Sequence, residues 1–214
     1  STSKVKINLK KKKKIISFVG KINTAKGYDI FGEAIIKILN KYPEWSAVVI
    51  GNEPRQKLFY NHPRLKILGF KDNVYVLNKL KEVSISVIPS KWDEPFGRSS
   101  LEAASRGCAI IRSDKGGLNE TTKASIVLKE LTSEEIYKHL VFLISKPIIL
   151  KKLQVKTYKE FKLTNDYSSN LLDKIRKELF KPKQEISIKS LKILHITNFN
   201  ERFNGRLHYN TGKR

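Results

Sequence analysis

The chain has 214 residues, which is room for one medium-sized domain with an appendage or for two very small domains. Its hydrophobic content of 40% is enough for an ordinary core, so the chain is not expected to be a disordered one. The single cysteine, Cys108, excludes an internal disulfide and a multi-cysteine zinc site, and its apolar neighbours predict a buried thiol. The histidines show no metal-ligand spacing, so no metal site is expected.

The formal net charge of +23 has two interpretations. It can serve an anionic partner such as nucleic acid, an anionic membrane surface or a phosphorylated ligand. Alternatively, the lysines only solvate the surface, since they are spread over the chain and form one block, Lys10 to Lys14. No nucleic-acid-binding motif accompanies them. We therefore expect no specific nucleic-acid partner, and a membrane surface is the better of the specific alternatives.

The chain contains no methionine, and we expect it to be an excerpt of a longer polypeptide. No apolar stretch approaches the roughly 18 residues needed to cross a bilayer, and no signal peptide is visible. These features predict a cytoplasmic protein, either free or peripheral at the inner face of the membrane.

Apolar runs and helical patterns alternate along the first part of the chain. The predicted strands are residues 15–20, 45–51, 65–69, 83–88, 108–112 and 124–128, and the predicted helices between them are 29–40, 53–60, 74–81 and 99–106. Short strands separated by helices indicate parallel pairing through crossover helices, hence an α/β fold with a Rossmann-like doubly wound sheet. From Ser133 the pattern is wholly helical, over 133–146, 147–162 and 167–180, which predicts a helical C-terminal extension.

The same patterns predict how the chain is divided. Residues 1–14 are a basic lead-in, 15–180 form the main domain, and 181–190 are a polar linker. Residues 191–214 contain a fresh apolar strand and a loop, interpreted as the truncated start of a further domain. The alternative is a C-terminal strand that pairs with the edge of the sheet.

The loop after the fourth strand carries the residues best suited to bind a ligand. Ligands of open parallel sheets bind at the carboxyl ends of the strands. Gly97 permits close approach of the backbone, and the free amides of Arg98 and Ser99 at a helix start suit a diphosphate. Glu94 and Glu102 can each accept two hydroxyls of a diol. The plainer alternative is an acid balancing the helix dipole at Glu94 and a surface acid at Glu102.

The spacing of Glu94 and Glu102, within Glu-Pro-Phe-Gly-x-x-x-Leu-Glu-Ala, closely resembles the paired-glutamate signature of glycosyltransferase family 4. These are retaining enzymes of the GT-B fold. The resemblance covers roughly residues 15 to 180. Three other segments follow in the order of the family: Phe18-Val19-Gly20-Lys21 with Lys26-Gly27 resembles its first phosphate loop, Leu68-Gly69-Phe70 its base-binding strand end, and Gly116-Gly117-Leu118-Asn119-Glu120 its last glycine-rich segment.

The resemblance implies a donor-binding domain. Its substrate would be a nucleoside-diphosphate sugar of the UDP or GDP type, with no separate cofactor and no metal. The hexose would pass with retention to a hydroxyl of an acceptor glycan or lipid-linked saccharide, in cell-envelope or polysaccharide synthesis. The acceptor domain of such enzymes is not present ahead of Ser1, so we expect this excerpt to be inactive alone. The strand from Leu191 resembles the opening of a second such domain, which implies a tandem transferase.

The resemblance also assigns roles to residues. Glu94 would be the catalytic residue and bind hexose hydroxyls, while Glu102 would bind the ribose diol. Lys21 stands where the family has an arginine, which keeps the charge but loses the bidentate fork. The predicted donor-binding residues are Gly20, Lys21, Lys26, Gly69, Phe70, Glu94, Phe96, Gly97, Arg98, Ser99 and Glu102.

Two other functions stay open. A non-enzymatic basic module would use the charge on nucleic acid or an anionic membrane, but it leaves the segment from Glu94 to Glu102 unexplained. A GT-B epimerase or phosphorylase would keep the fold and change the chemistry. A phosphorylase is not favoured, because the sequence shows no lysine in a context typical of cofactor binding.

Overall fold

The computed structural model describes residues 6–180. The predicted linker 181–190 and the strand from Leu191 lie outside the described residues, so both stay predictions. The described residues divide into two units between Asp173 and Lys174. The fold described below is that of the first unit. None of the described helices is long and apolar enough to cross a membrane.

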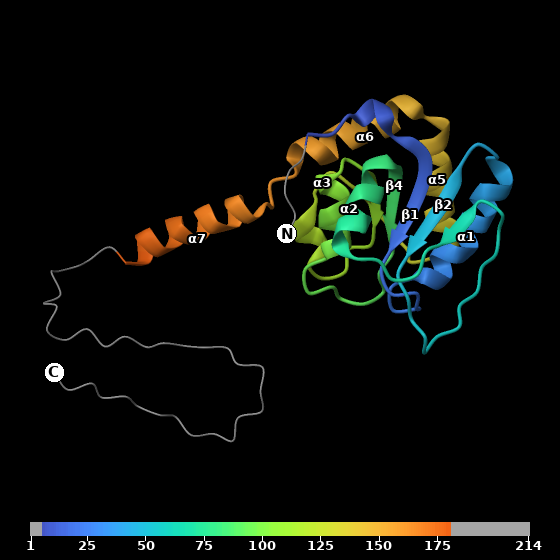
Figure 1. Cartoon of the computed structure of the whole chain (residues 1–214), viewed down its shortest axis with the longest axis horizontal. Coiled ribbons are helices and arrows are strands. Elements are labelled where there is room, and N and C mark those ends of the chain that lie inside the picture. Colours follow the sequence, from blue (N-terminus) through green and yellow to red (C-terminus); the bar gives the residue numbers. More distant parts are fainter. Residues whose placement is uncertain (1–5, 181–214) are drawn as a thin grey trace, which may run out of the picture. The chain divides into compact units, whose positions relative to one another are not determined.

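The first unit is built on one parallel sheet with the strand order β3-β2-β1-β4-β5-β6 (Figure 1). All five neighbouring pairs are parallel, which confirms the predicted doubly wound sheet. The strands are β1 (Lys13–Val19), β2 (Ser46–Ile50), β3 (Leu65–Ile67), β4 (Val83–Ile88), β5 (Ala109–Arg112) and β6 (Ile126–Val127).

Helices alternate with these strands and then follow them. The described helices are α1 (Tyr28–Lys41), α2 (Asn73–Glu82), α3 (Arg98–Ser105), α4 (Leu118–Thr121), α5 (Ser133–Ser145), α6 (Pro147–Glu160) and α7 (Asn165–Leu179), with a 3-10 turn at Leu9–Lys11. The last three confirm the predicted helical extension. Local signals fix their starts: the Thr132 side chain accepts a bond from the Glu135 amide at the head of α5, and Pro147 occupies the first turn of α6.

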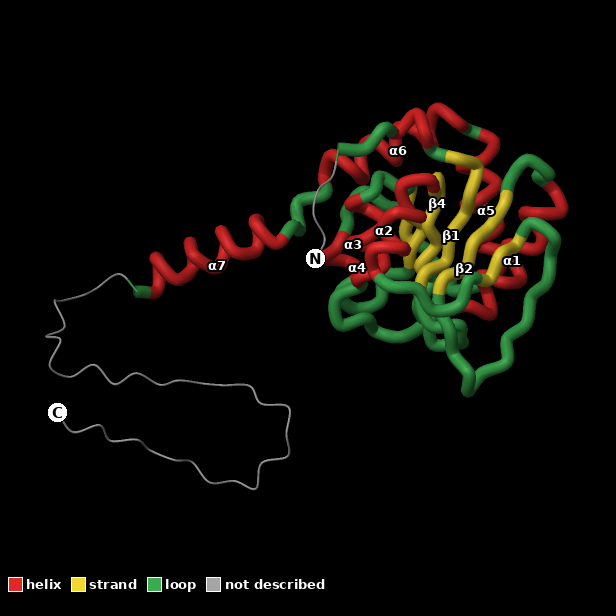
Figure 2. Tube along the Cα trace, viewed as in Figure 1, coloured by secondary structure: helices red, strands yellow, loops and turns green. Residues whose placement is uncertain are grey.

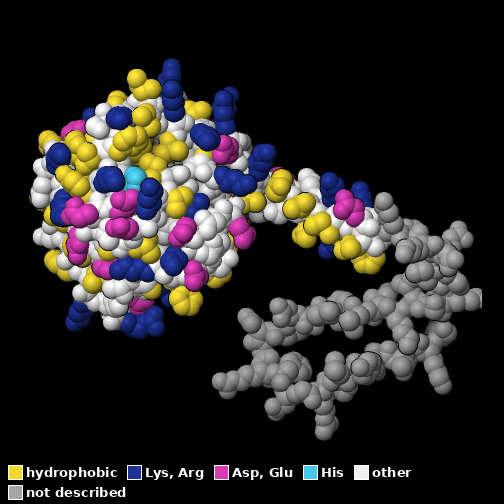
Figure 3. Space-filling view, turned by 180° about the vertical axis from the view of Figure 1, so that it is seen from behind, with side chains coloured by type: hydrophobic (Ala, Val, Ile, Leu, Met, Phe, Trp, Pro, Cys, Tyr) yellow, Lys and Arg dark blue, Asp and Glu magenta, His cyan; other side chains and the backbone are white. Residues whose placement is uncertain are grey.

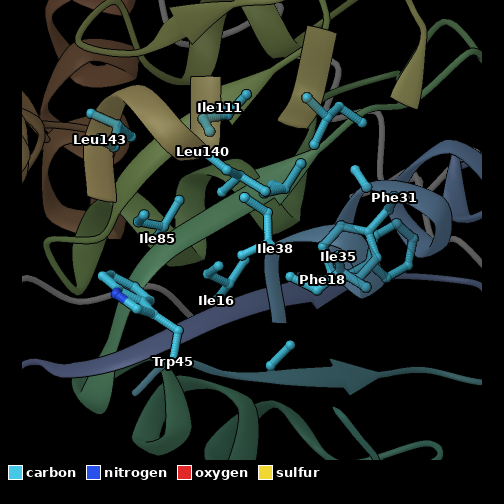
Figure 4. Close-up of a cluster of buried hydrophobic side chains, with 14 of the residues drawn as sticks. Ile16, Phe18, Phe31, Ile35, Ile38, Trp45, Ile85, Ile111, Leu140 and Leu143 are labelled. Carbon is cyan, nitrogen blue, oxygen red and sulfur yellow. The ribbon is translucent and has the colours of Figure 1, made fainter. Parts of the chain in front are cut away.

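Two hydrophobic clusters lie on opposite faces of the sheet. One joins α1 and α5 to the strands and contains the labelled residues of Figure 4, such as Ile16, Ile35 and Leu140. The other joins α2 and α3 to the strands through Leu80, Leu101 and their neighbours. Because helices cover both faces, a central strand such as β4 is buried along its whole length rather than at alternate residues.

The amino ends of β4 and β5 enclose the one cysteine of the chain. Cys108 is buried, as predicted, and burial raises the pKa of its thiol. Lys12 donates to the carbonyl oxygens of Leu80 and Val83, at 2.8 and 2.7 Å. The end of the basic lead-in therefore packs into the domain, and β1 begins at Lys13, before the expected boundary at residue 15.

The predicted helix over residues 53–60 is wrong. This segment is a turn followed by irregular backbone. Leu58 packs against the core, and the Tyr60 ring lies over Gly32 while its hydroxyl donates to the Asp29 carbonyl at 3.0 Å. Leu58 and Tyr60 are two residues apart, and a helix would turn their side chains to different faces. These tertiary contacts therefore override the local helix propensity.

The strand order reverses between β1 and β4, which are neighbours in the sheet although α1, β2, β3 and α2 separate them in sequence. Loops gather at the carboxyl ends of the strands, the lower edge in the view of Figure 2. Chains leaving β1 and β4 turn to opposite faces at such a switch point, so the rule for open parallel sheets places a ligand cleft there.

Candidate functional site

A cleft of about 310 Å³ opens at this switch point. It brings together most of the residues singled out in the sequence, from the loop after β1 and the loop after β4. Its walls are Phe18, Val19, Gly20, Lys21, Lys26, Ile88, Ser90, Glu94, Arg98, Ser99 and Glu102. Four wall residues were not in the predicted set. They lie at or just after the carboxyl ends of β1 and β4, which border the cleft: Phe18, Val19, Ile88 and Ser90.

Four predicted donor-binding residues do not line the cleft. Gly97 is the N-cap of α3, packed beside Leu118. Gly69 accepts a bond from the Gly51 amide through its carbonyl oxygen. Phe96 and Phe70 are exposed, Phe70 to 80%. The donor contacts of these four residues therefore stay predictions.

The start of α3 forms one wall. Gly97 supplies no capping side chain, and its carbonyl oxygen accepts bonds from the amides of Ser100 and Leu101, at 3.1 and 3.2 Å. The amides of Arg98 and Ser99, in the first turn, have no carbonyl of the helix to bind. Amides in this position, at the positive end of a helix dipole, suit an anion such as a phosphate.

An ion pair joins the two loops across the cleft. Lys26 Nζ lies 2.5 Å from Glu94 Oε1, and both side chains are more than two-thirds withdrawn from solvent. Gly27 makes this possible: its φ is +71°, and a Cβ at this position would lie 2.0 Å from the Pro89 carbonyl oxygen. The loop after β1 can therefore approach the loop after β4 only with glycine at this point.

The glycine-rich segment 116–117 supports Glu94 from behind. Gly116 forms a parallel bridge with Glu94, and the Gly117 amide donates to the Glu94 carbonyl oxygen at 2.6 Å. A Cβ on Gly116 would lie 2.4 Å from that oxygen. Gly116 and Gly117 do not line the cleft. Their contacts fix the backbone of Glu94, whose carboxylate does line it.

Glu102 lies in the second turn of α3 and is only 7% exposed, so the alternative of a surface acid is wrong. Asn73 Nδ2 donates to its Oε1 at 2.7 Å, and Arg98 lies 3.5 Å from the same oxygen. Burial raises the pKa of this carboxyl, while Arg98 and Asn73 act in the opposite direction. Sequence reasoning missed Asn73, because only the packing of α2 against α3 brings it to Glu102.

A second missed residue, Glu53, supports the loop that carries Lys26. Arg55 binds its carboxylate with two nitrogens, at 2.8 and 3.0 Å, and the Asn23 amide group lies 3.4 Å away. The bonds from Arg55 lower the pKa of Glu53 to about 2. Asn23 in turn accepts a bond from the Lys26 amide at 2.9 Å. Glu53 follows the carboxyl end of β2, a position that could have marked it as a candidate site residue. The wrong prediction of a helix over residues 53–60 kept it out of the predicted set.

Within residues 6–180, no group of three or more His, Cys, Asp and Glu side chains is placed to hold a metal ion. The walls of the cleft carry two lysines, an arginine, the amides at the start of α3 and two carboxylates. Cations and amides can neutralise a diphosphate, and the carboxylates can accept hydroxyl hydrogen bonds.

Residues 1–160 match the family model described as glycosyl transferases group 1. The chain belongs to this family. The match confirms the resemblance drawn from the paired glutamates, and it spans most of the described residues. The family match and the observed parallel sheet both agree with the prediction made from the paired-glutamate signature.

Curated relatives of this group 1 domain include a mannosyltransferase and a spore coat protein. The lipopolysaccharide core biosynthesis mannosyltransferase LpsB of Rhizobium meliloti is 26% identical over 128 residues, which are 55% of this chain and 36% of the relative. Spore coat protein SA of Bacillus subtilis is 32% identical over 118 residues, 49% of this chain and 31% of that protein. The chain thus spans about a third of the length of the curated relatives it matches.

Solved structures agree on the fold. The C-terminal domain of the group 1 family protein LpcC from Francisella tularensis superposes with a TM-score of 0.61 at 27% identity, covering 70% of this chain and 87% of that one. Anabaena Alr3699/HepE, solved in complex with UDP-glucose, gives 0.61 at 17% identity, covering 77% of this chain and 49% of that one. The described domain has the fold of a GT-B C-terminal domain.

Proposed function

We propose that this domain holds the activated sugar donor of a retaining hexosyltransferase. The donor is a nucleoside-diphosphate hexose of the UDP or GDP type. Lys21, Lys26 and the free amides of α3 bind the diphosphate, Glu94 binds the hexose, and Glu102 binds the ribose. The observation that carries the proposal is the single cleft in which cations, amides and both glutamates meet at the switch point of the sheet.

The order of these groups along the chain supports the assignment. Arg98 and Ser99 begin α3 between Glu94 and Glu102 in the sequence, and all four residues line the same cleft. A nucleoside-diphosphate sugar likewise has its diphosphate between a ribose and a hexose. Two relatives are also consistent with this donor, since one is a mannosyltransferase and the other was solved in complex with UDP-glucose.

The transfer itself needs more than this domain. In the proposed full enzyme a second domain brings an acceptor glycan or lipid-linked saccharide to the hexose bound at Glu94. The carboxylate of Glu94 would then stabilise positive charge that develops on the sugar during transfer. The net charge of +23 would favour association of the enzyme with an anionic membrane surface.

The rival function, a basic module for polyanions, gains little from the face of the molecule that Figure 3 shows. On the face shown in Figure 3, Lys and Arg side chains are scattered among acidic and hydrophobic ones rather than joined in one patch. The carboxylates in the cleft would also repel a phosphate backbone.

Calorimetric titration of the domain with UDP, GDP and ADP, and then with their common sugar derivatives, tests the proposal. We expect one nucleoside diphosphate to bind and one of its sugars to bind through the same site. Absence of binding to all of them at about millimolar concentration would overturn it. Salt-sensitive binding to unrelated polyanions that does not change when Glu94 is replaced would favour the basic module.

A further inference from the structure

We propose that Asn73 is a positioning residue for the ribose end of the cleft: it holds the Glu102 carboxylate and ties it to the loop that precedes α2. This inference rests on the proposed function, because it assumes that Glu102 binds a ribose. It adds a residue outside the signature segment and gives the start of α2 a part in nucleoside recognition.

Asn73 is held firmly at the first position of α2. The preceding residue, Asp72, caps the helix by accepting a bond from the Tyr75 amide at 2.7 Å. From this fixed turn the Asn73 side chain reaches α3, where Nδ2 donates to Glu102 Oε1 at 2.7 Å. The hydrogen bond therefore links two helices that come from different loops of the carboxyl edge.

The Glu102 carboxylate depends on such a partner. It is only 7% exposed, and a buried charge is costly unless hydrogen bonds compensate its lost hydration. Among the described residues, the charged groups that act on it are Arg98, in the first turn of α3, and Arg106, the residue that caps the end of α3. Arg98 is the nearer at 3.5 Å, but its side chain is 76% exposed, so water and salt weaken its effect. Asn73 is the close donor from α2.

The bond also sets which oxygen faces the ligand. Asn73 and Arg98 both contact Oε1. Oε2 is thereby left to accept a ribose hydroxyl, with the carboxylate unable to rotate freely. The segment Leu68-Gly69-Phe70, which the family resemblance assigns to the base, lies a few residues before Asn73 in the chain. A nucleoside bound by both elements would meet one connected unit.

The test uses variants of the domain and three readouts: affinity for the nucleoside diphosphate that binds, affinity for its 2′-deoxy form, and the pH dependence of both between about pH 4.5 and pH 8. Asn73→Ala should weaken the ribonucleotide about tenfold and reduce the ratio of ribo to deoxy affinity. It should also move the acidic limb of the binding profile to higher pH, because Glu102 loses a donor that favours its charged form.

Two further variants make the result decisive. Asn73→Asp keeps the shape but sets a second carboxylate against Glu102, so it should shift the acidic limb further than Ala does. Asn78→Ala is the matched control: Asn78 lies on the exposed side of α2 and accepts a bond from Lys81 at 2.8 Å. It should leave all three readouts unchanged.

A purely structural role for Asn73 predicts another pattern. The melting temperature of the Ala and Asp variants would fall, while the ribo-to-deoxy ratio and the pH profile stayed those of the wild type; that result overturns the inference. If the wild-type domain binds no nucleoside diphosphate, the proposed function fails and the inference fails with it. Binding by the wild type with unchanged Asn73 variants rejects the inference alone.

Discussion

Lys26 Nζ and Glu94 Oε1 lie 2.5 Å apart, and the two residues come from loops on either side of the switch between β1 and β4. The family resemblance assigns them to different parts of one ligand, the diphosphate and the hexose. A donor that engaged both would exchange this ion pair for phosphate oxygens on Lys26 and sugar hydroxyls on Glu94. Binding of the two halves of the donor should therefore be separable by substitution.

Replacement of Glu94 by Gln should distinguish the sugar from the diphosphate. The amide keeps the size of the side chain and one acceptor oxygen but loses the charge. Affinity for the nucleoside diphosphate should be spared, while the cognate nucleotide sugar should lose about 1 kcal/mol or more, since bonds to charged acceptors are the stronger ones. Calorimetry with both ligands measures the difference.

Asp93→Asn is the control for this substitution, because Asp93 is the exposed neighbour of Glu94 and lies outside the cleft walls. Its affinities for both ligands should stay those of the wild type. An acid that only balanced the dipole of α3 would instead lower the melting temperature of Glu94→Gln and affect both ligands equally. Equal losses would mean that Glu94 is structural.

Lys26→Ala should weaken the nucleoside diphosphate by about 1 to 3 kcal/mol, through loss of a charge-assisted bond to phosphate. The loss should shrink as salt concentration rises. Lys91→Ala removes a nearby lysine that is paired with Asp29 at 2.6 Å and lies outside the cleft walls, so it controls for a general loss of positive charge. Similar losses in the two variants would assign binding to the overall charge.

Glu102→Gln should trade binding for stability. The folded state raises the pKa of Glu102 above its ordinary value of 4.5, so it holds the proton more tightly than the unfolded chain. Stability is then lost as pH rises through the interval between the two pKa values. The Gln variant, which does not titrate, should melt at a higher temperature than the wild type at neutral pH, with the gap closing at acidic pH.

The same variant should bind the ribonucleotide about 1 to 3 kcal/mol less tightly, and a 2′-deoxy ligand should cause little further loss. Thermal melts across pH and calorimetry with the two ligands measure these effects. A lower melting temperature at neutral pH, or a full additional penalty for the deoxy ligand, would contradict the assignment of Glu102 to the ribose.

Much of this architecture could be predicted from the sequence, for physical reasons. Strands buried on both faces appear as apolar runs, as in residues 47–50 of β2, and the helices between them force parallel pairing. Parallel pairing in turn places the loops after β1 and β4 at one edge, the edge that carries Lys26 and Glu94.

The parts that could not be predicted depend on contacts between segments distant in sequence. Asn73 meets Glu102 only because α2 packs beside α3, and no spacing rule joins positions 29 residues apart. Residues 53–60 have helix-compatible composition, but Tyr60 is held over Gly32 by tertiary contacts. Local propensity is weak beside such packing.

The close approach of the two cleft loops gives a last prediction, about stability alone. Gly27 and Gly69 have almost the same φ, +71° and +67°, in the left-handed region that other residues enter at a cost of about 1 to 2 kcal/mol. Their surroundings differ: a Cβ at Gly27 would lie 2.0 Å from the Pro89 carbonyl oxygen, whereas nothing lies within 4 Å of one at Gly69.

Gly69→Ala should therefore lower the free energy of unfolding by about 1 to 2 kcal/mol, the backbone cost alone. Gly27→Ala should lower it by clearly more, because the methyl group must push the loop that carries Lys26 away from the loop that carries Glu94. Urea denaturation of both variants measures the two losses, and their difference isolates the close approach from the conformational strain. Equal losses would show that the loops separate without cost, and the Lys26–Glu94 pair could then not be a rigid feature of the cleft.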